Sequence, residues 1–305
     1  MSLPNIIRSL RPIQWFKNLV VFAAIIFARE LFLTTKFVPV FYTFLIFSAA
    51  SSAMYLINDL ADTERDKLHF SKRFRPIAAG KLTKQTALTS ALFLASLSLV
   101  GSYYLSSYLF FIVLLYFSIQ LLYTFWLKEI IILDVLAIAF SFMLRIFAGS
   151  FVVLTPLSAW LILTTMMLAL FLGIGKRRSE LTLLARAALR HRRALLSYPV
   201  ALLDGLVFMM ATATLITYSL FTFNSPEPSQ KEFFSSFLPQ TLSSPKILMA
   251  TIPIVVYGIF RYLYLVFEKS EGESPEKILI TDRPLAFSVI AWLAAVIFFL
   301  YFFSL

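Results

Sequence analysis

Three aspartates stand close together in a chain that has few acidic residues. Asp59, Asp62 and Asp66 are spaced i, i+3 and i+7, which places them on one face if the segment is helical. Asn58 precedes Asp62 by one turn. Carboxylates that share a face repel one another unless a cation lies among them, and oxygen ligands of this kind suit Mg²⁺. The spacing therefore predicts a magnesium site formed by Asn58 and the three aspartates, with the aspartates as catalytic groups.

Basic residues follow the aspartates closely. Lys72, Arg73 and Arg75 come soon after Asp66. Mg²⁺ usually takes some of its ligands from phosphate oxygens, while Arg and Lys side chains bind phosphate directly. A solvated acidic helix end, balanced by neighbouring cations, is the alternative interpretation. The combination of carboxylates and cations at one place favours a site for a phosphorylated substrate.

A second basic group opens near position 176. Lys176 and Arg177 directly follow a hydrophobic stretch, and Glu180 comes one helical turn after Lys176. One interpretation is that both cations anchor a membrane protein on its cytoplasmic side. The other is that they face a cavity between helices and bind substrate. On the second interpretation, the segments 58–84 and 176–198 together form a cap over the site.

Further polar residues lie in or beside hydrophobic stretches. Asp134 and Arg145 fall within one such stretch, where ionisable groups are costly and are functional candidates. They stand eleven residues apart, or about 16 Å along a helix at 1.5 Å per residue, so they cannot pair directly. Lys17 stands at the entry to the first stretch, either as an anchor that reaches the membrane surface or as a phosphate ligand.

The composition indicates the class of protein to which these candidate residues belong. The chain has 305 residues, of which 60% are hydrophobic and 14% are charged, and its mean hydropathy is +0.84. Soluble domains have roughly 45–50% apolar and about 25% charged residues. A disordered chain, a coiled coil and a nucleic-acid-binding domain are therefore disfavoured, and no nucleic acid partner is expected. The net charge of +11 instead suggests a positive-inside bias and a phosphate-bearing substrate.

Stretches of about 20 apolar residues predict membrane-spanning helices. They are rich in Phe, Leu and Ile and do not alternate with polar residues, so the sequence predicts an all-α polytopic membrane protein rather than a barrel. The first stretch is the weakest, because Arg29 and Glu30 interrupt it. The nine predicted spans are 15–33, 38–57, 85–105, 107–126, 130–152, 156–175, 199–222, 247–267 and 284–304.

The loops between the predicted spans indicate the orientation. With the N-terminus inside, the inside segments hold 21 basic residues and the outside loops hold 4. This bias predicts a cytoplasmic N-terminus, an outside C-terminus and a site on the cytoplasmic face of the cell membrane. The whole chain, 1–305, is expected to form one integral-membrane catalytic domain.

The aspartate motif resembles a known family. Asn58-Asp59-x-x-Asp62-x-x-x-Asp66, at the end of a second span in a chain of nine, is similar to the first aspartate-rich motif of the UbiA superfamily of intramembrane prenyltransferases. Within that superfamily the chain is most similar to the decaprenyl-phosphate phosphoribosyltransferases. The strings that carry this similarity are Gln14-Trp15-x-Lys17-Asn18, Lys72-Arg73-Phe74-Arg75-Pro76, Leu133-Asp134-Val135, Leu144-Arg145, Gly175-Lys176-Arg177 with Glu180, and Asp282-Arg283-Pro284.

The resemblance implies a reaction and a set of binding residues. It implies a UbiA-like bundle that transfers 5-phosphoribose from phosphoribosyl diphosphate to a polyprenyl phosphate, with Mg²⁺ as cofactor and diphosphate as leaving group. The product would serve the synthesis of cell-envelope arabinan. The resemblance also favours Lys17 as a phosphate ligand. The substrate-binding residues that we expect on this basis are Lys17, Asn58, Arg73, Arg75, Tyr123, Lys128, Asp134, Arg145, Lys176, Arg177 and Glu180.

The chain departs from the superfamily pattern after the sixth predicted span. Aromatic prenyltransferases usually carry a second aspartate-rich motif there, whereas this chain has Lys176-Arg177-Arg178 and only Glu180 as an acid. More cations and fewer carboxylates suit a donor with several phosphates. The alternative function is transfer of a prenyl group from prenyl diphosphate to an aromatic acceptor. A transporter is less favoured, because its ionisable residues would lie near the bilayer midplane.

Overall fold

The computed structural model of the chain describes residues 3–68, 72–187, 198–225, 246–268 and 275–302. Every regular element within these ranges is helical, which confirms the all-α prediction. The chain forms two compact units. The first unit comprises Met1–Pro156 and Leu183–Pro199, and the second comprises Leu157–Thr182 and Val200–Leu305.

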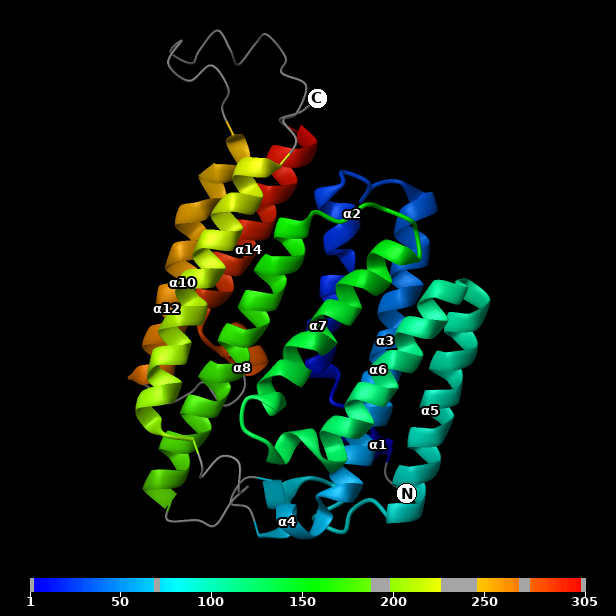
Figure 1. The fold of residues 1–305 in the computed structure, drawn as a ribbon. Coiled ribbons are helices and arrows are strands. Elements are labelled where there is room, and N and C mark those ends of the chain that lie inside the picture. Colours follow the sequence, from blue (N-terminus) through cyan, green and yellow to red (C-terminus); the bar gives the residue numbers. More distant parts are fainter. Residues whose placement is uncertain (1–2, 69–71, 188–197, 226–245, 269–274, 303–305) are drawn as a thin grey trace, which may run out of the picture. The chain divides into compact units, whose positions relative to one another are not determined.

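The first unit contains the predicted aspartate motif. Its longest helix is α3, which packs against α5 and α6, while α7 packs against α6 and η1 (Figure 1). The elements are α1 (Leu3–Leu10), the 3₁₀ helix η1 (Pro12–Phe22), α2 (Ala23–Phe27), α3 (Thr34–Ala61), α4 (Thr63–Lys67), η2 (Lys72–Phe74), α5 (Lys84–Leu105), α6 (Ser107–Phe125), η3 (Leu127–Glu129) and α7 (Leu133–Phe151).

The second unit is built on four long helices. In it α12 packs against both α10 and α14. The Asp282 side chain accepts a hydrogen bond from the Leu285 N–H at 3.0 Å and so caps α14, with Pro284 in the first turn. The sequence predicts this cap, because Asp suits a helix N-terminus and Pro its first turn. The elements are α8 (Ala159–Ala187), α10 (Val200–Asn224), η5 (Ile247–Thr251), α12 (Ile252–Phe267), α13 (Pro275–Thr281), α14 (Arg283–Ile297) and η6 (Phe298–Phe302).

Most of the predicted spans correspond to helices of the structure. Within the described residues, eight helices are long and apolar enough to cross a membrane. A ninth is added if Pro4–Leu10 and Pro12–Phe27, which meet at 41°, count as one broken span. The prediction for 15–33 is the least accurate, because helical structure ends at Phe27 and the Arg29 backbone has a φ of 62°.

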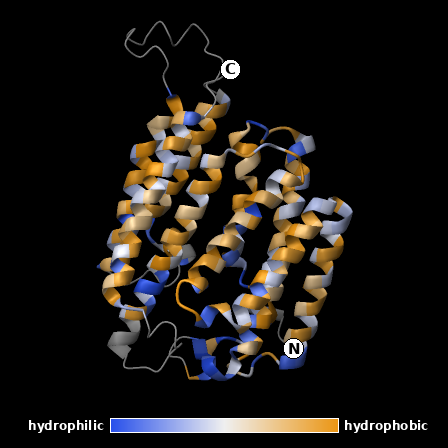
Figure 2. Cartoon of the chain, viewed as in Figure 1, coloured by the Kyte–Doolittle hydropathy of each residue, from blue (hydrophilic) through white to orange (hydrophobic). Residues whose placement is uncertain are grey.

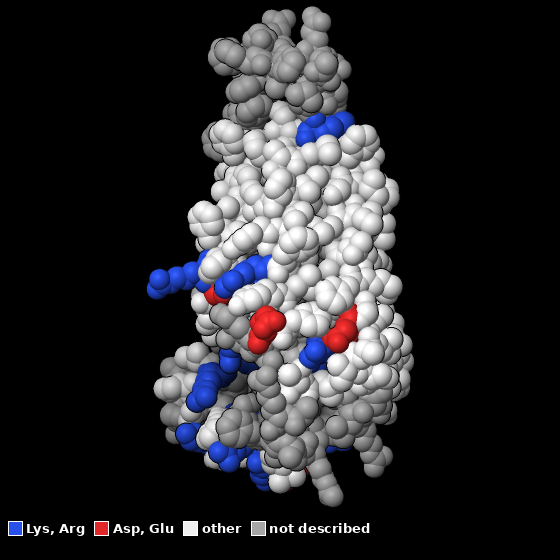
Figure 3. All heavy atoms as spheres, turned by 90° about the vertical axis from the view of Figure 1, so that its left-hand side faces the viewer, with Lys and Arg blue, Asp and Glu red and all other residues white. Residues whose placement is uncertain are grey.

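Hydrophilic residues cluster at one end of the first unit. Figure 2 shows them around α4 and the helix ends beside it, whereas the long helices are mainly hydrophobic. Figure 3 shows a different face, on which most of the area described is white, with charged residues at mid-height and below and a basic group near the opposite end. The mainly hydrophobic surface of the long helices is that expected of helices that lie in a bilayer.

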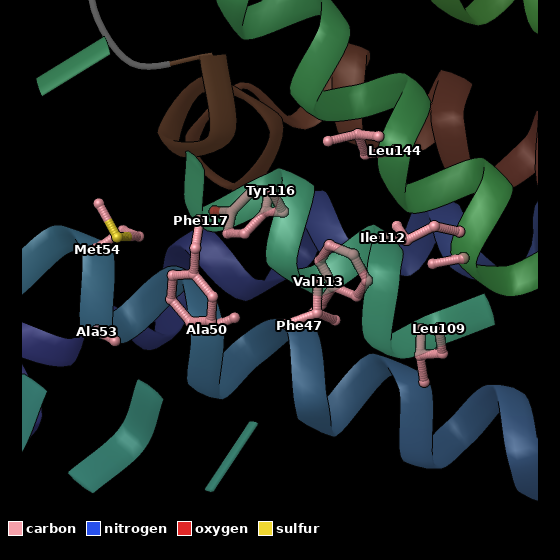
Figure 4. Close-up of a cluster of buried hydrophobic side chains, with 11 residues drawn as sticks. Phe47, Ala50, Ala53, Met54, Leu109, Ile112, Val113, Tyr116, Phe117 and Leu144 are labelled. Atoms are coloured by element: carbon pink, nitrogen blue, oxygen red, sulfur yellow. The ribbon is translucent and has the colours of Figure 1, made fainter. Parts of the chain in front are cut away.

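The core of the first unit lies between α3, α6 and α7. Small residues on α3, Ala50 and Ala53, lie among larger ones such as Phe47, Val113 and Phe117 (Figure 4). In a bilayer, close packing of this kind holds helices together, because lipid tails are as apolar as the side chains. The core therefore fixes α3 against its neighbours and so determines where its polar end lies.

Gly149 lets the backbones of η1 and α7 approach closely. A Cβ atom at this position would lie 1.8 Å from the Val21 carbonyl oxygen, so no other residue fits without displacing η1. The contact holds the end of η1 against the last turn of α7. It also brings Asn18, one turn of 3₁₀ helix before Val21, into the interior.

Candidate active site

The three aspartates lie at the end of α3 and at the start of α4. Asp59 belongs to the last turn of α3, Asp62 joins the two helices, and Asp66 lies in α4. The Asp66 N–H donates to the Asp62 carbonyl at 2.8 Å, and the Asp62 N–H donates to the Asn58 carbonyl at 2.9 Å. The chain thus remains nearly helical through the motif. All three side chains are buried, with exposed fractions of 2%, 7% and 4%.

Two arginines bind Asp59. Arg11 Nη2 lies 2.5 Å from Asp59 Oδ1, and Arg75 Nη1 lies 3.0 Å from the same oxygen. Arg75 Nη1 also lies 2.6 Å from Asp66 Oδ2, so one guanidinium bridges two carboxylates. Arg11 lies in the turn between α1 and η1, with a φ of 53°, and its guanidinium stacks on the Tyr55 ring at 5.0 Å.

The third aspartate has a basic partner of its own. Lys128 Nζ lies 2.6 Å from Asp62 Oδ1, and the Lys128 side chain is 3% exposed. Lys128 lies in η3, the short helix after α6, and Arg65 forms an ion pair with the neighbouring Glu129 at 2.5 Å. Two ion pairs thus hold η3 against the end of α3 and against α4. The sequence predicts a binding role for Lys128, and the structure places it at the aspartates.

Burial changes the acidity of one aspartate. It raises the pKa of the Asp66 carboxyl above its usual value, and the nearby Arg75 guanidinium offsets part of this rise. Glu64, on the exposed side of α4, differs, since its hydrogen bond to Lys67 lowers its pKa. The contrast follows from position, because Asp66 is buried whereas the Glu64 side chain is exposed.

The donor atoms at this site fit Mg²⁺ in kind. Asn58 Oδ1 is buried and accepts no hydrogen bond from the described residues. Asn58 adjoins Asp59 in sequence and precedes Asp62 by one helical turn, so its amide belongs to the same segment as the aspartates. Among the described residues no three carboxylate or imidazole side chains converge on one point, because each aspartate faces a basic partner instead. The ligand types that Mg²⁺ prefers are present, but they are engaged by Arg and Lys.

A row of polar side chains continues from the aspartates along α3. Trp15 Nε1 donates to Ser52 Oγ at 3.0 Å, and Asn18 Nδ2 donates to Ser48 Oγ at 3.1 Å. Because a 3₁₀ helix repeats every three residues, Trp15 and Asn18 lie on one face of η1, and Ile13 and Phe16 lie on another that is exposed. The η1 helix therefore presents a polar face to α3 and an apolar face outwards.

Lys17 lies on the third face of η1. It is half-buried, and its Nζ atom lies 2.5 Å from Gln14 Oε1. This position is consistent with both interpretations of Lys17 that the sequence leaves open.

Arg145 is buried inside the first unit without a carboxylate partner among the described residues. Its Nε atom donates to Asn18 Oδ1 at 2.7 Å, Nη1 to the Ser141 carbonyl at 2.6 Å and Nη2 to the Tyr116 hydroxyl at 3.3 Å. The Phe47 and Tyr116 rings lie 5.8 Å and 5.0 Å from its Cζ atom. Arg145 thus links η1, α6 and α7, and no contact joins it to Asp134.

Asp134 forms a separate cluster at the start of α7. Its Oδ1 atom accepts hydrogen bonds from the Tyr198 hydroxyl at 2.9 Å and from the Val135 N–H at 2.9 Å. The Tyr198 hydroxyl also accepts a hydrogen bond from the Ile132 N–H at 2.6 Å, where the Ile132 backbone has a φ of 72°. The sequence analysis does not predict Tyr198 as a partner of Asp134. No local pattern indicates this contact, because 64 residues separate the two.

Two other predicted residues of the first unit lie on η2 and α6. The Arg73 guanidinium is exposed and lies over the Phe74 ring at 4.8 Å. Tyr123 is half-buried on α6. Arg11 was not among the binding residues that the sequence predicts, yet it binds Asp59 directly.

The basic residues of the second unit lie within a helix and not in a loop. The prediction that a loop begins at 176 is wrong, because α8 continues to Ala187. Arg177 is 3% exposed, and its Nη1 atom lies 2.6 Å from Glu180 Oε2, while Lys176 Nζ lies 4.0 Å from Glu180 Oε1. The burial of Arg177 disfavours a role as a surface anchor. Residues 188–197 of the predicted cap lie outside the described residues.

Comparisons with known proteins agree with this arrangement. The family model described as the UbiA prenyltransferase family matches residues 19–280. A decaprenyl-phosphate phosphoribosyltransferase of Mycobacterium tuberculosis is 34% identical over 296 residues, which cover 96% of this chain and 93% of that protein. A protein of the same name from Corynebacterium glutamicum is 32% identical over 302 residues, covering 97% of this chain and 87% of the relative.

A solved structure resembles the whole chain. It is a UbiA homologue from Archaeoglobus fulgidus bound to GPP and Mg²⁺, with a TM-score of 0.68 and 18% identity, covering 96% of this chain and 98% of that one. At this identity the likeness concerns the fold. Taken with the family match over most of the chain, it shows that the chain belongs to the UbiA prenyltransferase family and is a multi-pass membrane transferase.

Proposed function

We propose that this transferase moves 5-phosphoribose from phosphoribosyl diphosphate to a polyprenyl phosphate and releases diphosphate. The observation that carries the proposal is the similarity to decaprenyl-phosphate phosphoribosyltransferases over nearly the whole chain. The charges support it, since Arg11, Arg75 and Lys128 lie at the aspartates and Lys176 and Arg177 form a second basic group. A donor and an acceptor with several phosphates between them require such cations.

Asn58, Asp59, Asp62 and Asp66 are the residues that would hold Mg²⁺ on the donor diphosphate. When bound there, the metal neutralises the charge that develops on the leaving diphosphate. The burial of the aspartates strengthens this effect, because charges interact more strongly away from water.

The transfer exchanges one bond for another at C1 of the ribose. The C1–oxygen bond to diphosphate breaks, and a phosphate oxygen of the lipid forms a new bond to C1, through an oxocarbenium-like transition state. The nucleophile is a phosphate monoester that is already anionic at neutral pH, so no strong base is needed. This agrees with the composition, because the chain has only two His residues.

The remaining cations would bind the 5-phosphate of the donor and the phosphate of the lipid. Lys17, half-buried beside Gln14, and the exposed Arg73 are the candidates in the first unit. Lys176 and Arg177 are the candidates in the second unit, and we assign both units to one catalytic domain. Arg145 and Asp134 would act by holding η1 and α7, because their described contacts are with the protein itself.

The positive-inside bias supports a site on the cytoplasmic face, where a water-soluble donor would be available. The chain has no Cys, so single introduced cysteines report its topology cleanly. An impermeant thiol reagent on intact cells should label Thr35→Cys and should label Lys81→Cys only after the membrane is opened. The reverse pattern would contradict the orientation.

The alternative is transfer of a prenyl group to an aromatic acceptor. It is favoured by the likeness in fold to a homologue that was solved with GPP. Purified protein offered each donor with each acceptor separates the two. We expect turnover only with phosphoribosyl diphosphate and polyprenyl phosphate, while turnover only with a prenyl diphosphate and an aromatic acid would select the alternative.

A further inference from the structure

The three aspartates of the motif are already paired with basic side chains of the protein. Three aspartates face three cations, with Arg11 and Arg75 at Asp59, Arg75 also at Asp66, and Lys128 at Asp62. The shortest of these contacts is 2.5 Å, and the aspartates are at most 7% exposed. This group of six charges is balanced before any metal is bound.

We propose that Arg75 takes the place of the metal in the donor-free enzyme, so that Mg²⁺ and diphosphate bind strongly only together. The proposal rests on the proposed function for the identity of the diphosphate. Arg75 Nη1 contacts Asp59 and Asp66 at 3.0 Å and 2.6 Å, and thereby occupies carboxylate oxygens from both helices, α3 and α4. These are oxygens that the metal requires as ligands.

Electrostatics opposes the binding of the metal alone. Like charges repel one another more strongly away from water, and this site is buried. A dication added to a balanced, buried group would be repelled by Arg11, Arg75 and Lys128, and it would compete with them for oxygens. Asn58 Oδ1 is the ligand-type oxygen that the structure leaves without a partner at this place.

The diphosphate removes this opposition. Its negative charges offer Arg75 new partners, so the guanidinium can leave Asp59 and Asp66 to the metal and bind phosphate oxygens instead. Arg75 is suited to this exchange, because its side chain is 24% exposed and follows the short helix η2. Lys128 is less suited, because its side chain is only 3% exposed. By linkage, each ligand raises the affinity for the other by the same factor.

The test measures metal binding without turnover. Equilibrium dialysis of the purified protein, with Mn²⁺ as the probe, gives the Mn²⁺ affinity in the presence and absence of inorganic diphosphate. We expect diphosphate to tighten Mn²⁺ binding at least about tenfold, within the usual range of coupling between sites. An equal Mn²⁺ affinity with and without diphosphate would overturn the proposal, and this comparison needs no variant.

A variant identifies the residue responsible. Arg75→Gln should bind Mn²⁺ alone more tightly than the wild type, and diphosphate should tighten its Mn²⁺ binding less. Arg65→Gln is the matched control, because Arg65 adjoins Asp66 in sequence but pairs with Glu129, and its Mn²⁺ affinity should not change. If Arg75→Gln binds Mn²⁺ no more tightly than the wild type, Arg75 is not the competing cation. Coupled binding without phosphoribosyl transfer would refute the proposed function alone, and transfer without coupling would refute this inference alone.

Discussion

Two buried groups of charged side chains in the first unit differ in the partners that surround each charge. At the aspartates, each charge faces an opposite charge, as Lys128 faces Asp62. Around Arg145, the guanidinium is met by an amide, a carbonyl, a hydroxyl and aromatic rings, and by no carboxylate among the described residues. The first group can exchange one charged partner for another, as a site for metal and phosphate requires. The second has no charged partner to exchange, so it acts as a fixed joint between η1, α6 and α7.

The largest expected effect is on turnover at the first group. Asp59→Asn should lower the rate of transfer roughly a thousandfold, because a metal ligand supplies several kcal/mol of transition-state stabilisation. The protein should remain folded, since Arg75 keeps Asp66 as a partner. Initial rates, with gel filtration as a check of folding, measure both. Glu64→Gln, on the exposed side of α4, is the control and should keep its rate.

A smaller effect is expected on stability at the same group. Lys128→Met should lower the free energy of unfolding by about 3–5 kcal/mol, because it leaves the Asp62 carboxylate buried without its cation. Unfolding in mixed detergent micelles measures it. The double variant Asp62→Asn with Lys128→Met should regain most of this loss, and failure to regain it would mean that the loss comes from packing.

The second group should respond more mildly to the same kind of change. Arg145→Met should cost about 1–3 kcal/mol, because it leaves neutral groups such as Asn18 Oδ1 unpaired rather than a buried charge. The same unfolding measurement applies. A cost equal to that of Lys128→Met would remove the distinction between the two groups.

The smallest effect is expected at the exposed edge of the first group. The ion pair of Arg65 and Glu129 is short, at 2.5 Å, but the Arg65 side chain is 64% exposed. Exposed pairs contribute about 0–1 kcal/mol, so Arg65→Gln should change the free energy of unfolding by no more than that. A larger loss would show that η3 depends on this pair for its position.

Sequence reasoning predicts elements that depend on local pattern. The predicted span 107–126 matches α6, Ser107–Phe125, because an apolar run of this length has few alternatives in a bilayer. The predicted loops after the second and sixth spans begin too early, since α3 continues to Ala61 and α8 to Ala187. The prediction ends each helix at the first polar residues after the apolar run. A helix can continue beyond the membrane into water, and both of these helices do.

Pairings between distant residues could not be predicted in the same way. The spacing of Asp59, Asp62 and Asp66 predicts that they share a face, and the resemblance to a family added Lys128. Neither indicates that Lys128 binds Asp62, which lies 66 residues away. Arg11 was missed as a partner of Asp59 because its position depends on the turn at φ 53° before η1. Such contacts are set by packing, which the order of residues along the chain does not reveal.

One measurement tests the central claim most directly. Phosphoribosyl diphosphate that carries one label in the ribose and another in the β-phosphate is incubated with purified protein, polyprenyl phosphate and Mg²⁺, and the lipids are then extracted. We expect the ribose label to move into the lipid phase at the rate at which the phosphate label appears as free diphosphate, and Asp59→Asn to slow both to the same extent. Retention of both labels in the intact donor by the folded wild-type protein would contradict the account.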